Sequence, residues 1–122
     1  MDKKILLVDD AAFMRMLIRN TLTTNGYTNI LEAADGEIAV STYSAEKPDL
    51  VIMDITMPNK TGIEALKEIR RHTTQLPVIM QTAYAFDTDR RIAEEAGCNG
   101  FITKPVMPRE LKMYLDMILK KA

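Results

Sequence analysis

The sequence predicts an α/β fold in which a parallel β-sheet is covered by helices on both faces. Five short apolar runs alternate with longer segments of helical period along the 122 residues, and this alternation is typical of such a sheet. Three of the runs, residues 5–8, 50–53 and 78–82, show no polar alternation, as expected for strands covered on both faces. A chain of this length buries about two-thirds of its unfolded surface, so we expect one self-supporting domain over residues 1–122 and no separate output domain.

We expect five strands, each a run of four or five mostly apolar residues. The runs cover residues 5–8, 30–33, 50–53, 78–82 and 100–103, and the second run is the weakest. Parallel strands need a crossover connection, usually a helix, and segments with helical period lie between and after these runs.

The first two helices are predicted from apolar positions three and four residues apart. The first helix ends near Asn25 and Gly26, residues that commonly follow the end of a helix. The second begins at Asp35 and Gly36 and ends before Pro48, because a residue that precedes proline disfavours the helical conformation. The residues expected to face the core are Met14, Leu17, Ile18 and Leu22 in the first helix and Ala39, Val40 and Tyr43 in the second.

The last three helices are predicted from capping residues as well as from period. Thr61 and Glu64 have the spacing of a capping box at the start of the third helix. The fourth helix covers about residues 87–96 and is ended by Gly97, and the fifth begins near Pro108, which suits a first turn. The expected core residues are Leu66 and Ile69 in the third helix, Ile92, Ala93 and Ala96 in the fourth, and Leu111, Leu115, Ile118 and Leu119 in the fifth.

The composition argues against several classes of protein. The formal net charge is -1, whereas nucleic acids and anionic membranes select basic partners. No apolar stretch approaches the length of a signal peptide or of a membrane span. Cys98 is the only cysteine, so an internal disulfide is impossible and a reducing compartment fits best. We therefore expect a cytoplasmic protein that binds neither nucleic acid nor membrane.

Acidic residues follow two of the predicted strands. Asp9 and Asp10 come directly after residues 5–8, and Asp54 comes directly after residues 50–53. If these strands are parallel neighbours, the three carboxylates share the crevice outside the carboxyl ends of the strands, where open α/β sheets bind ligands. At about 5 Å apart and an effective dielectric of about 20, each pair would repel by about 3 kcal/mol. Carboxylates crowded in this way either share a proton or hold a hard cation.

Two further side chains are expected at the same edge of the sheet. Thr82 ends the fourth strand and Lys104 follows the fifth. A lysine there offers a point charge to an anion, and a hydroxyl offers a hydrogen bond. With a bound cation, this edge is suited to phosphate chemistry.

Five motifs in one order carry a resemblance that spans the whole chain. They are Val8-Asp9-Asp10, Met53-Asp54, Met57-Pro58 with Gly62, Thr82-Ala83 and Lys104-Pro105. This set resembles the receiver domains of bacterial two-component response regulators, and residues 8–15 look most like the stand-alone chemotaxis regulators of that family. The resemblance implies a flavodoxin-like, doubly wound sheet of five strands in the order 2-1-3-4-5, with five helices.

The resemblance also implies a role for each residue of the crevice. Asp54 is the expected phosphoacceptor, attacking a phosphohistidine on a sensor histidine kinase. Asp10, Asp54 and the backbone carbonyl of Thr56 are expected to bind Mg²⁺ directly, and Asp9 is expected to act largely through water. Such a ligand set is sufficient for Mg²⁺, which keeps several waters. Lys104 and the metal are expected to neutralise charge on the transferring phosphoryl group.

Signal output is implied for another part of the molecule. Thr82 is expected to move toward the acyl phosphate, and an aromatic residue of the fifth strand to rotate with it. This residue is Phe101, where chemotaxis members of the family carry a tyrosine. Tyr84 occupies a position that influences the lifetime of the phosphoryl group. Met113 and Met117 lie opposite the core stripe of the fifth helix, and with the fourth helix and fifth strand they form the expected surface for a downstream protein.

The sequence leaves more than one function open. The leading hypothesis is a phosphorylated switch rather than an enzyme, acting in chemotaxis, as a phosphorelay shuttle, or as a receiver like those of hybrid sensor kinases. A small phosphohydrolase of the haloacid dehalogenase type also uses a strand-end aspartate. Such enzymes carry an Asp-x-Asp motif at this site, whereas this chain has Asp54-Ile55-Thr56 and lacks the second acidic residue. A nucleotide- or flavin-binding module would need a Gly-rich loop where Asp9-Asp10-Ala11-Ala12 stands.

Overall fold

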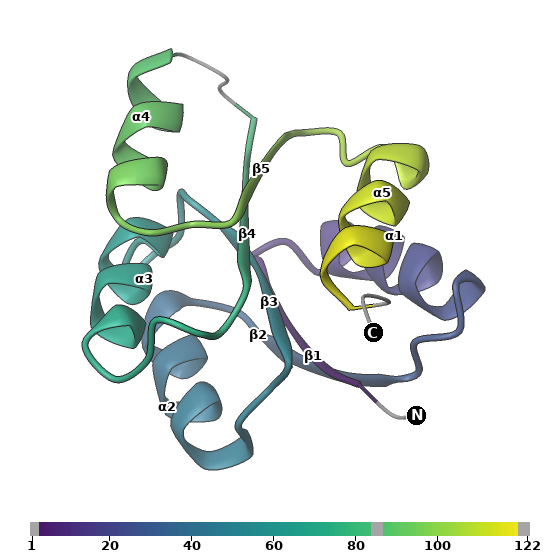
Figure 1. Ribbon diagram of the computed structural model, residues 1–122, viewed down its shortest axis with the longest axis horizontal. Coiled ribbons are helices and arrows are strands. Elements are labelled where there is room, and N and C mark those ends of the chain that lie inside the picture. Colours follow the sequence, from purple (N-terminus) through teal and green to yellow (C-terminus); the bar gives the residue numbers. More distant parts are fainter. Residues whose placement is uncertain (1–2, 84–86, 120–122) are drawn as a thin grey trace.

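The structure is a three-layer arrangement with a parallel β-sheet in the middle (Figure 1). The computed structural model describes residues 3–83 and 87–119, and in these ranges the sheet has five strands in the order β2-β1-β3-β4-β5. All neighbouring strands are parallel. The strands are β1 (Lys4–Val8), β2 (Asn29–Ala33), β3 (Leu50–Asp54), β4 (Val78–Thr82) and β5 (Gly100–Thr103). The predicted fold class and strand order are confirmed.

Helices cover both faces of this sheet. They are α1 (Ala12–Thr24), α2 (Gly36–Glu46), α3 (Gly62–Arg70), α4 (Asp87–Glu95) and α5 (Pro108–Ile118). Helices α1 and α5 lie on one face, and α2, α3 and α4 lie on the other (Figure 1). Because β2 and β3 lie on opposite sides of β1, the order of the strands reverses there. In doubly wound sheets this reversal marks the crevice where ligands bind.

Each strand contributes alternate residues to two hydrophobic cores. In β1, Leu6 and Val8 belong to the core under α2, α3 and α4, while Ile5 and Leu7 belong to the core under α1 and α5. All four side chains are fully buried, which explains why this strand shows no polar alternation in the sequence. Because both faces of the central strands are covered, their carboxyl ends are where polar side chains can gather.

Hydrogen bonds confirm the predicted starts of α2 and α3. Thr61 Oγ1 accepts from the backbone amide of Glu64 at 3.2 Å, and the Glu64 carboxylate accepts from the amide of Thr61 at 2.9 Å. This reciprocal pair is the capping box expected from the spacing of the two residues. Asp35 caps α2 by accepting from the amide of Ile38 at 2.8 Å.

Two predicted core positions are wrong. Leu17 of α1 is 39% exposed and Ile92 of α4 is 42% exposed. On α1 the inward direction is set by Ile18 and Leu22, which are buried one turn apart, and Leu17 lies about 100° around the helix from Ile18. On α4 the smaller Ala93 is the buried residue, so the adjacent Ile92 projects toward solvent.

The carboxyl-terminal ends of α4 and α5 also differ slightly from expectation. Helix α4 ends at Glu95 rather than Ala96, and Ile118 and Leu119 are only partly buried. Gly97 follows α4 with a φ of +103°, a conformation that glycine adopts readily, so the predicted end signal is confirmed. Within the described ranges, no helix combines the length and apolar character needed to cross a membrane.

Candidate functional site

Three carboxylates meet at the carboxyl ends of β1 and β3. Val8 pairs in register with Met53, so the next residues along the two strands, Asp9 and Asp54, are neighbours at the edge of the sheet. One carboxylate oxygen from each of Asp9, Asp10 and Asp54 lies within 4.8 Å of the others. Asp9 and Asp54 are buried, whereas Asp10 is exposed. The structure therefore brings together the acidic residues that follow the two strands in the sequence.

Lys104 bridges the two buried carboxylates. Its Nζ lies 2.8 Å from Asp9 Oδ2 and 3.2 Å from Asp54 Oδ2. The backbone amide of Lys104 donates to the carbonyl of Thr82 at 2.7 Å, which extends the pairing of β4 and β5 and fixes the point from which the lysine side chain starts. Three carboxylates and one ammonium carry two excess negative charges, which matches the charge of one divalent cation.

The pKa values of Asp54 and Lys104 reflect this crowding. Burial raises the pKa of Asp54 above its ordinary value, the Lys104 ammonium opposes the shift, and the Asp9 carboxylate adds to it. Burial alone would lower the pKa of Lys104, but its hydrogen bond to Asp9 and the charges of Asp54 and Asp9 outweigh burial and raise it. One lysine shared by two carboxylates therefore stays charged, while Asp54 remains incompletely compensated.

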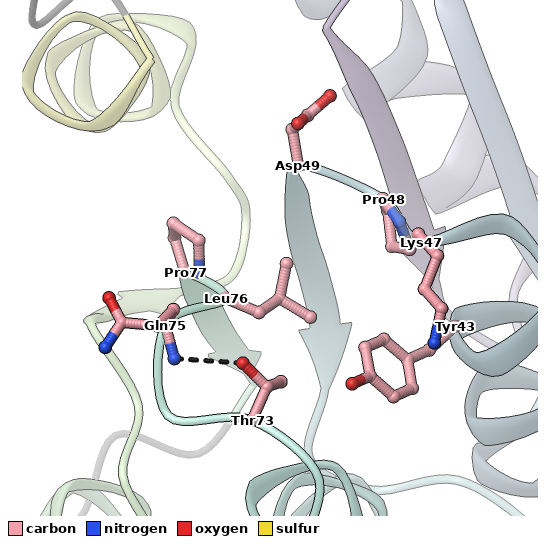
Figure 2. Close-up of a pocket in the computed structure, with 8 residues that line it drawn as sticks. All are labelled: Tyr43, Lys47, Pro48, Asp49, Thr73, Gln75, Leu76 and Pro77. Atoms are coloured by element: carbon pink, nitrogen blue, oxygen red, sulfur yellow. Dashed lines mark hydrogen bonds between the residues drawn. The ribbon is translucent and has the colours of Figure 1, made fainter.

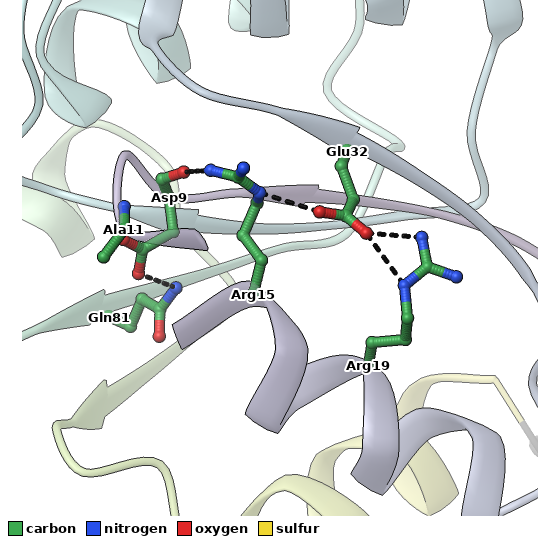
Figure 3. Close-up of polar contacts among 6 residues, drawn as sticks. All are labelled: Asp9, Ala11, Arg15, Arg19, Glu32 and Gln81. Atoms are coloured by element: carbon green, nitrogen blue, oxygen red, sulfur yellow. Dashed lines mark hydrogen bonds and ion pairs between the residues drawn. The ribbon is translucent and has the colours of Figure 1, made fainter. Parts of the chain in front are cut away.

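Protein donors occupy both carboxylate oxygens of Asp9. Oδ1 accepts from the backbone amide of Ala11 at 2.9 Å. Oδ2 accepts from Gln81 Nε2 at 3.3 Å (Figure 3) and also contacts Lys104. In the described part of the chain, no such donor reaches the side chain of Asp10. A cation can therefore approach Asp10 without competing with a protein donor, whereas at Asp9 it would share carboxylate oxygens that already accept from protein donors.

The donor set fits a small, hard cation. Carboxylate oxygens suit Mg²⁺, which takes only one or two carboxylates and keeps several waters, and the exposed Asp10 leaves room for those waters. Thr56 is exposed as well, and its backbone amide acts to lower the pKa of the Asp54 carboxyl, so the segment after β3 runs beside the site. A metal contact from the Thr56 carbonyl stays a prediction.

Gln81 belongs to the site although no motif in the sequence marks it. It is fully buried in β4, where it pairs in register with Asp54 of β3, and its amide nitrogen reaches Asp9. Its Oε1 is buried and has no hydrogen-bond partner among the described residues. A glutamine in an otherwise apolar strand was the available signal, because a polar side chain in a covered strand needs a buried partner.

Thr82 ends β4 at the same edge of the sheet, but its side chain lies on the opposite face from that of Gln81. Alternation along β4 places it on the face of Met80, and Met80 pairs in register with Phe101 of β5. Thr82 and Phe101 are 3% and 4% exposed. The Arg90 guanidinium of α4 lies 4.9 Å from the centre of the Phe101 ring, so Phe101 links β5 to α4. Tyr84 lies outside the described residues.

Helix α5 presents two methionines to solvent. Met113 and Met117 are 49% and 56% exposed. Tyr114 between them turns toward β5, where its hydroxyl accepts from the Phe101 amide at 3.3 Å and donates to the Phe101 carbonyl at 3.4 Å. Because β5 is an edge strand, this hydroxyl covers backbone groups that have no further strand to pair with. We refer to Arg90, Phe101, Met113, Tyr114 and Met117 together as the output face, after the role that the sequence resemblance predicts for this surface.

A separate hollow lies at the opposite end of the sheet (Figure 2). Its volume is about 310 Å³, and residues just before β3 and β4, including Asp49 and Pro77, line it together with Tyr43 of α2. Within it, Thr73 Oγ1 already accepts from the amide of Gln75 at 3.1 Å. Because the three carboxylates lie at the other end of the strands, this hollow is not part of the acidic site.

Known proteins are similar to this chain in both sequence and fold. The family model described as the response regulator receiver domain matches residues 5–116. Chemotaxis protein CheY of Bacillus subtilis is 48% identical over 105 residues, which cover 86% of this chain and 88% of that protein. The alkaline phosphatase synthesis transcriptional regulatory protein PhoP of Bacillus subtilis is 36% identical over 122 residues, which cover 100% of this chain and 50% of that protein.

The solved structure of chemotaxis protein CheY4 from Vibrio cholerae has the same architecture. Its TM-score with this chain is 0.88 at 30% sequence identity, and the match covers 98% of this chain and 100% of that chain. The chain thus spans about half the length of the transcriptional regulator and most of the length of the chemotaxis proteins.

Proposed function

Because the chain belongs to the family of response regulator receiver domains, we propose that it is a signalling switch that a sensor histidine kinase activates by phosphorylating Asp54. The position of Asp54 carries the proposal: it is a buried carboxylate with Lys104 at 3.2 Å and two further carboxylates nearby. A nucleophile, a positive charge and an acidic cluster suited to a divalent cation are the parts that phosphoryl transfer requires.

The proposed reaction is a displacement at phosphorus. An oxygen of Asp54 forms the new P–O bond while the P–N bond of the kinase phosphohistidine breaks. The histidine nitrogen leaves with the electron pair of that bond and takes up a proton from solvent water. Lys104 exchanges a carboxylate partner for an oxygen of the transferred group, so that its ammonium remains paired while it neutralises developing charge.

The same edge is the proposed binding site for Mg²⁺. Asp10, Asp54 and the carbonyl of Thr56 would hold the ion, and Asp9 would act through water. The chemistry that such an ion supplies is neutralisation of the negative charge on the phosphoryl oxygens during transfer. The excess of two negative charges at this edge supports a divalent rather than a monovalent ion.

Readout of the phosphoryl group is proposed to follow the face of the sheet that α4 covers. Thr82 and Phe101 both belong to that face, so movement of Thr82 toward a phosphorylated Asp54 would change the packing of Phe101 against Arg90. The exposed Met113 and Met117 then offer adaptable apolar contacts to a downstream protein. Two states that differ by a few kcal/mol suffice for such a switch.

Within the family, we propose a cytoplasmic role in chemotaxis. The support is 48% identity to a chemotaxis protein of which the match covers 88%. A receiver of a transcriptional regulator is the second candidate, supported by the match to PhoP. Faster transfer from a chemotaxis kinase than from the kinase of a transcriptional regulator would favour the first role, and the reverse order would favour the second. Onward transfer to another histidine-containing protein would identify a phosphorelay shuttle instead.

Intact-mass analysis after incubation with acetyl phosphate and Mg²⁺ tests the proposed phosphoacceptor. We expect the wild type to gain the mass of one phosphoryl group and to lose this gain with a chelator. Asp54→Asn should gain nothing, whereas Asp49→Asn, at the other end of β3, should label like the wild type. Equal labelling of Asp54→Asn would exclude Asp54 as the acceptor, and turnover of simple phosphomonoesters would favour a phosphohydrolase.

A further inference from the structure

Arg15 in the first turn of α1 contacts the acidic site through the backbone of Asp9. One of its terminal nitrogens donates to the carbonyl oxygen of Asp9, and its Nε donates to Glu32 Oε1 at 2.7 Å (Figure 3). The Arg15 side chain is only 18% exposed. Its guanidinium therefore joins two elements, the end of β1 and the edge strand β2, at the point where the acidic loop begins.

The Asp9 carbonyl is part of the planar peptide group that leads into Asp10. The other polar groups of Asp9 are already fixed, because its amide donates to the Ala33 carbonyl at 3.1 Å and its Oδ1 accepts from the Ala11 amide. A held carbonyl fixes the orientation of the Asp9–Asp10 peptide. Arg15 therefore contacts the peptide group from which the exposed Asp10 side chain extends beside Asp54.

Glu32 orients the Arg15 guanidinium. It lies on β2, where it pairs in register with Leu7 of β1, and it also accepts from Arg19 Nε at 2.8 Å. Burial opposes the charge on Glu32, but the hydrogen bonds from Arg19 and Arg15 outweigh burial and lower its pKa. Two guanidinium groups thus hold one carboxylate, and the carboxylate in turn holds Arg15 in the direction of Asp9.

We propose that Arg15 is a positioning residue for the cation site: its guanidinium, aligned by Glu32, holds the Asp9–Asp10 peptide so that the Asp10 and Asp54 carboxylates converge. The inference rests on the proposed function, because it concerns the Mg²⁺ site of the phosphorylated switch. It assigns a role to a residue that touches neither the metal position nor the phosphoryl group. Partners of this kind typically change metal affinity by about 10- to 100-fold when they are removed.

Charge and position make opposite predictions for Arg15, which makes the inference testable. A positive charge close to the acidic cluster repels Mg²⁺, so a role in charge alone predicts tighter Mg²⁺ binding when that charge is removed. A role in position predicts weaker binding. Arg15→Lys separates the two further, because lysine keeps the charge but lacks the planar fork that can contact a carboxylate and a carbonyl together.

The experiment is a Mg²⁺ titration of the unphosphorylated chain, followed by the unfolding midpoint and by the backbone amide signal of Asp10. We expect Arg15→Lys, Arg15→Met and Glu32→Gln each to weaken Mg²⁺ binding by about tenfold. Arg70→Met is the matched control, because Arg70 also holds a backbone carbonyl, that of Gly97 at 3.0 Å, but at the end of the sheet away from the carboxylates, and its Mg²⁺ affinity should stay at the wild-type value. Unfolding midpoints in metal-free buffer show that each variant is folded.

Two results would overturn the inference, and they are distinct from a failure of the proposed function. The first result applies when the wild type responds to Mg²⁺. If the Arg15→Lys variant then binds Mg²⁺ as tightly as the wild type, or the Arg15→Met variant binds it more tightly, Arg15 has no positioning role, and the proposed switch is unaffected. A wild-type chain whose midpoint and Asp10 signal do not respond to Mg²⁺ would overturn the proposed cation site and the role of Arg15 together.

Discussion

The acidic edge and the output face differ in how firmly their side chains are held. At the acidic edge, Asp9 and Asp54 are buried and share Lys104 at 2.8 and 3.2 Å, and the backbone amide of Ala11 donates to Asp9 at 2.9 Å. On the output face, Met113 and Met117 are about half exposed. There the Tyr114 hydroxyl makes its contacts with Phe101 at 3.3 and 3.4 Å, both longer than the usual range of hydrogen-bond distances.

This difference matches the two tasks of a switch. Phosphoryl transfer depends on groups that are already in place when charge develops, so a fixed edge favours the reaction. Recognition of a partner tolerates rearrangement, and flexible methionine side chains can adapt to more than one surface. We therefore expect substitutions at the acidic edge to have large effects on stability or chemistry, and substitutions on the output face to affect association alone.

The largest expected effect comes from Gly62, where α3 begins against the end of β3. A Cβ at this position would lie 2.0 Å from the carbonyl oxygen of Asp54 and 2.9 Å from the Cα of Ile55. Backbone atoms cannot rotate away, so the end of β3 would have to move. We expect Gly62→Ala to lower the free energy of unfolding by about 3 kcal/mol, the upper end of the usual cost of overpacking, and to slow labelling by acetyl phosphate.

Gly26→Ala is the control for a general effect of replacing glycine. Gly26 has a φ of +91°, but a Cβ there meets no atom within 4 Å. The left-handed conformation alone costs about 1–2 kcal/mol for a residue with a side chain, and acetyl phosphate labelling should not change. Equal losses of stability in the two variants, measured by urea denaturation, would show that the acidic edge is not the tightly packed region we describe.

An opposite, intermediate effect is expected for Asp54→Asn in metal-free buffer. Burial and the Asp9 charge raise the pKa of Asp54 against the opposing effect of Lys104, so the ionised carboxylate destabilises the folded state. Burial is the largest cause of the raised pKa, and the Lys104 charge offsets part of it, so removing the charge should stabilise the chain by on the order of 1 kcal/mol. Mg²⁺ should reverse the order, because it stabilises a state that binds it.

The pH dependence gives the sign of this effect independently. A carboxyl group with a raised folded-state pKa binds protons more readily in the folded state, so wild-type stability falls as pH rises from the ordinary value of 3.8 through the raised value. The advantage of Asp54→Asn should therefore be absent at lower pH and complete above the raised pKa. Denaturation midpoints across this range measure it, with Asp49→Asn as a control that should gain nothing. An advantage that grows on acidification would contradict the argument.

The contrast between the two regions also separates what the sequence could predict from what it could not. Strand positions followed from the apolar runs, and the acidic edge followed because Asp9, Asp10 and Asp54 come directly after two of them. Parallel strands end at one edge, so local position was enough. Strand order depended on family resemblance, because the composition of a buried run does not indicate which run lies beside it.

Contacts that depend on register or helix rotation could not be predicted. Arg15 reaches Glu32 because β1 and β2 pair in a particular register. The same apolar pattern would also allow other registers. Gln81 lies in β4 and reaches Asp9 at the end of β1, although β3 separates these two strands in the sheet. The wrong placement of Leu17 has a related cause, since Ile18 beside it is equally apolar and only tertiary packing decides which of the two faces the sheet.

The smallest expected effect on the folded domain comes from the output face. Because Met113 and Met117 are exposed, replacing both by glutamate should change the free energy of unfolding by no more than about 0.5 kcal/mol and leave acetyl phosphate labelling of Asp54 unchanged. Binding of the phosphorylated chain to its downstream protein, or its self-association with beryllofluoride and Mg²⁺, should be lost, because charged side chains would replace adaptable apolar contacts.

Sedimentation analysis measures both the binding of the downstream protein and the self-association. Met16→Glu, on α1 at 47% exposure, should leave association intact. If the double variant associates like the wild type, these methionines are surface residues without a role in output.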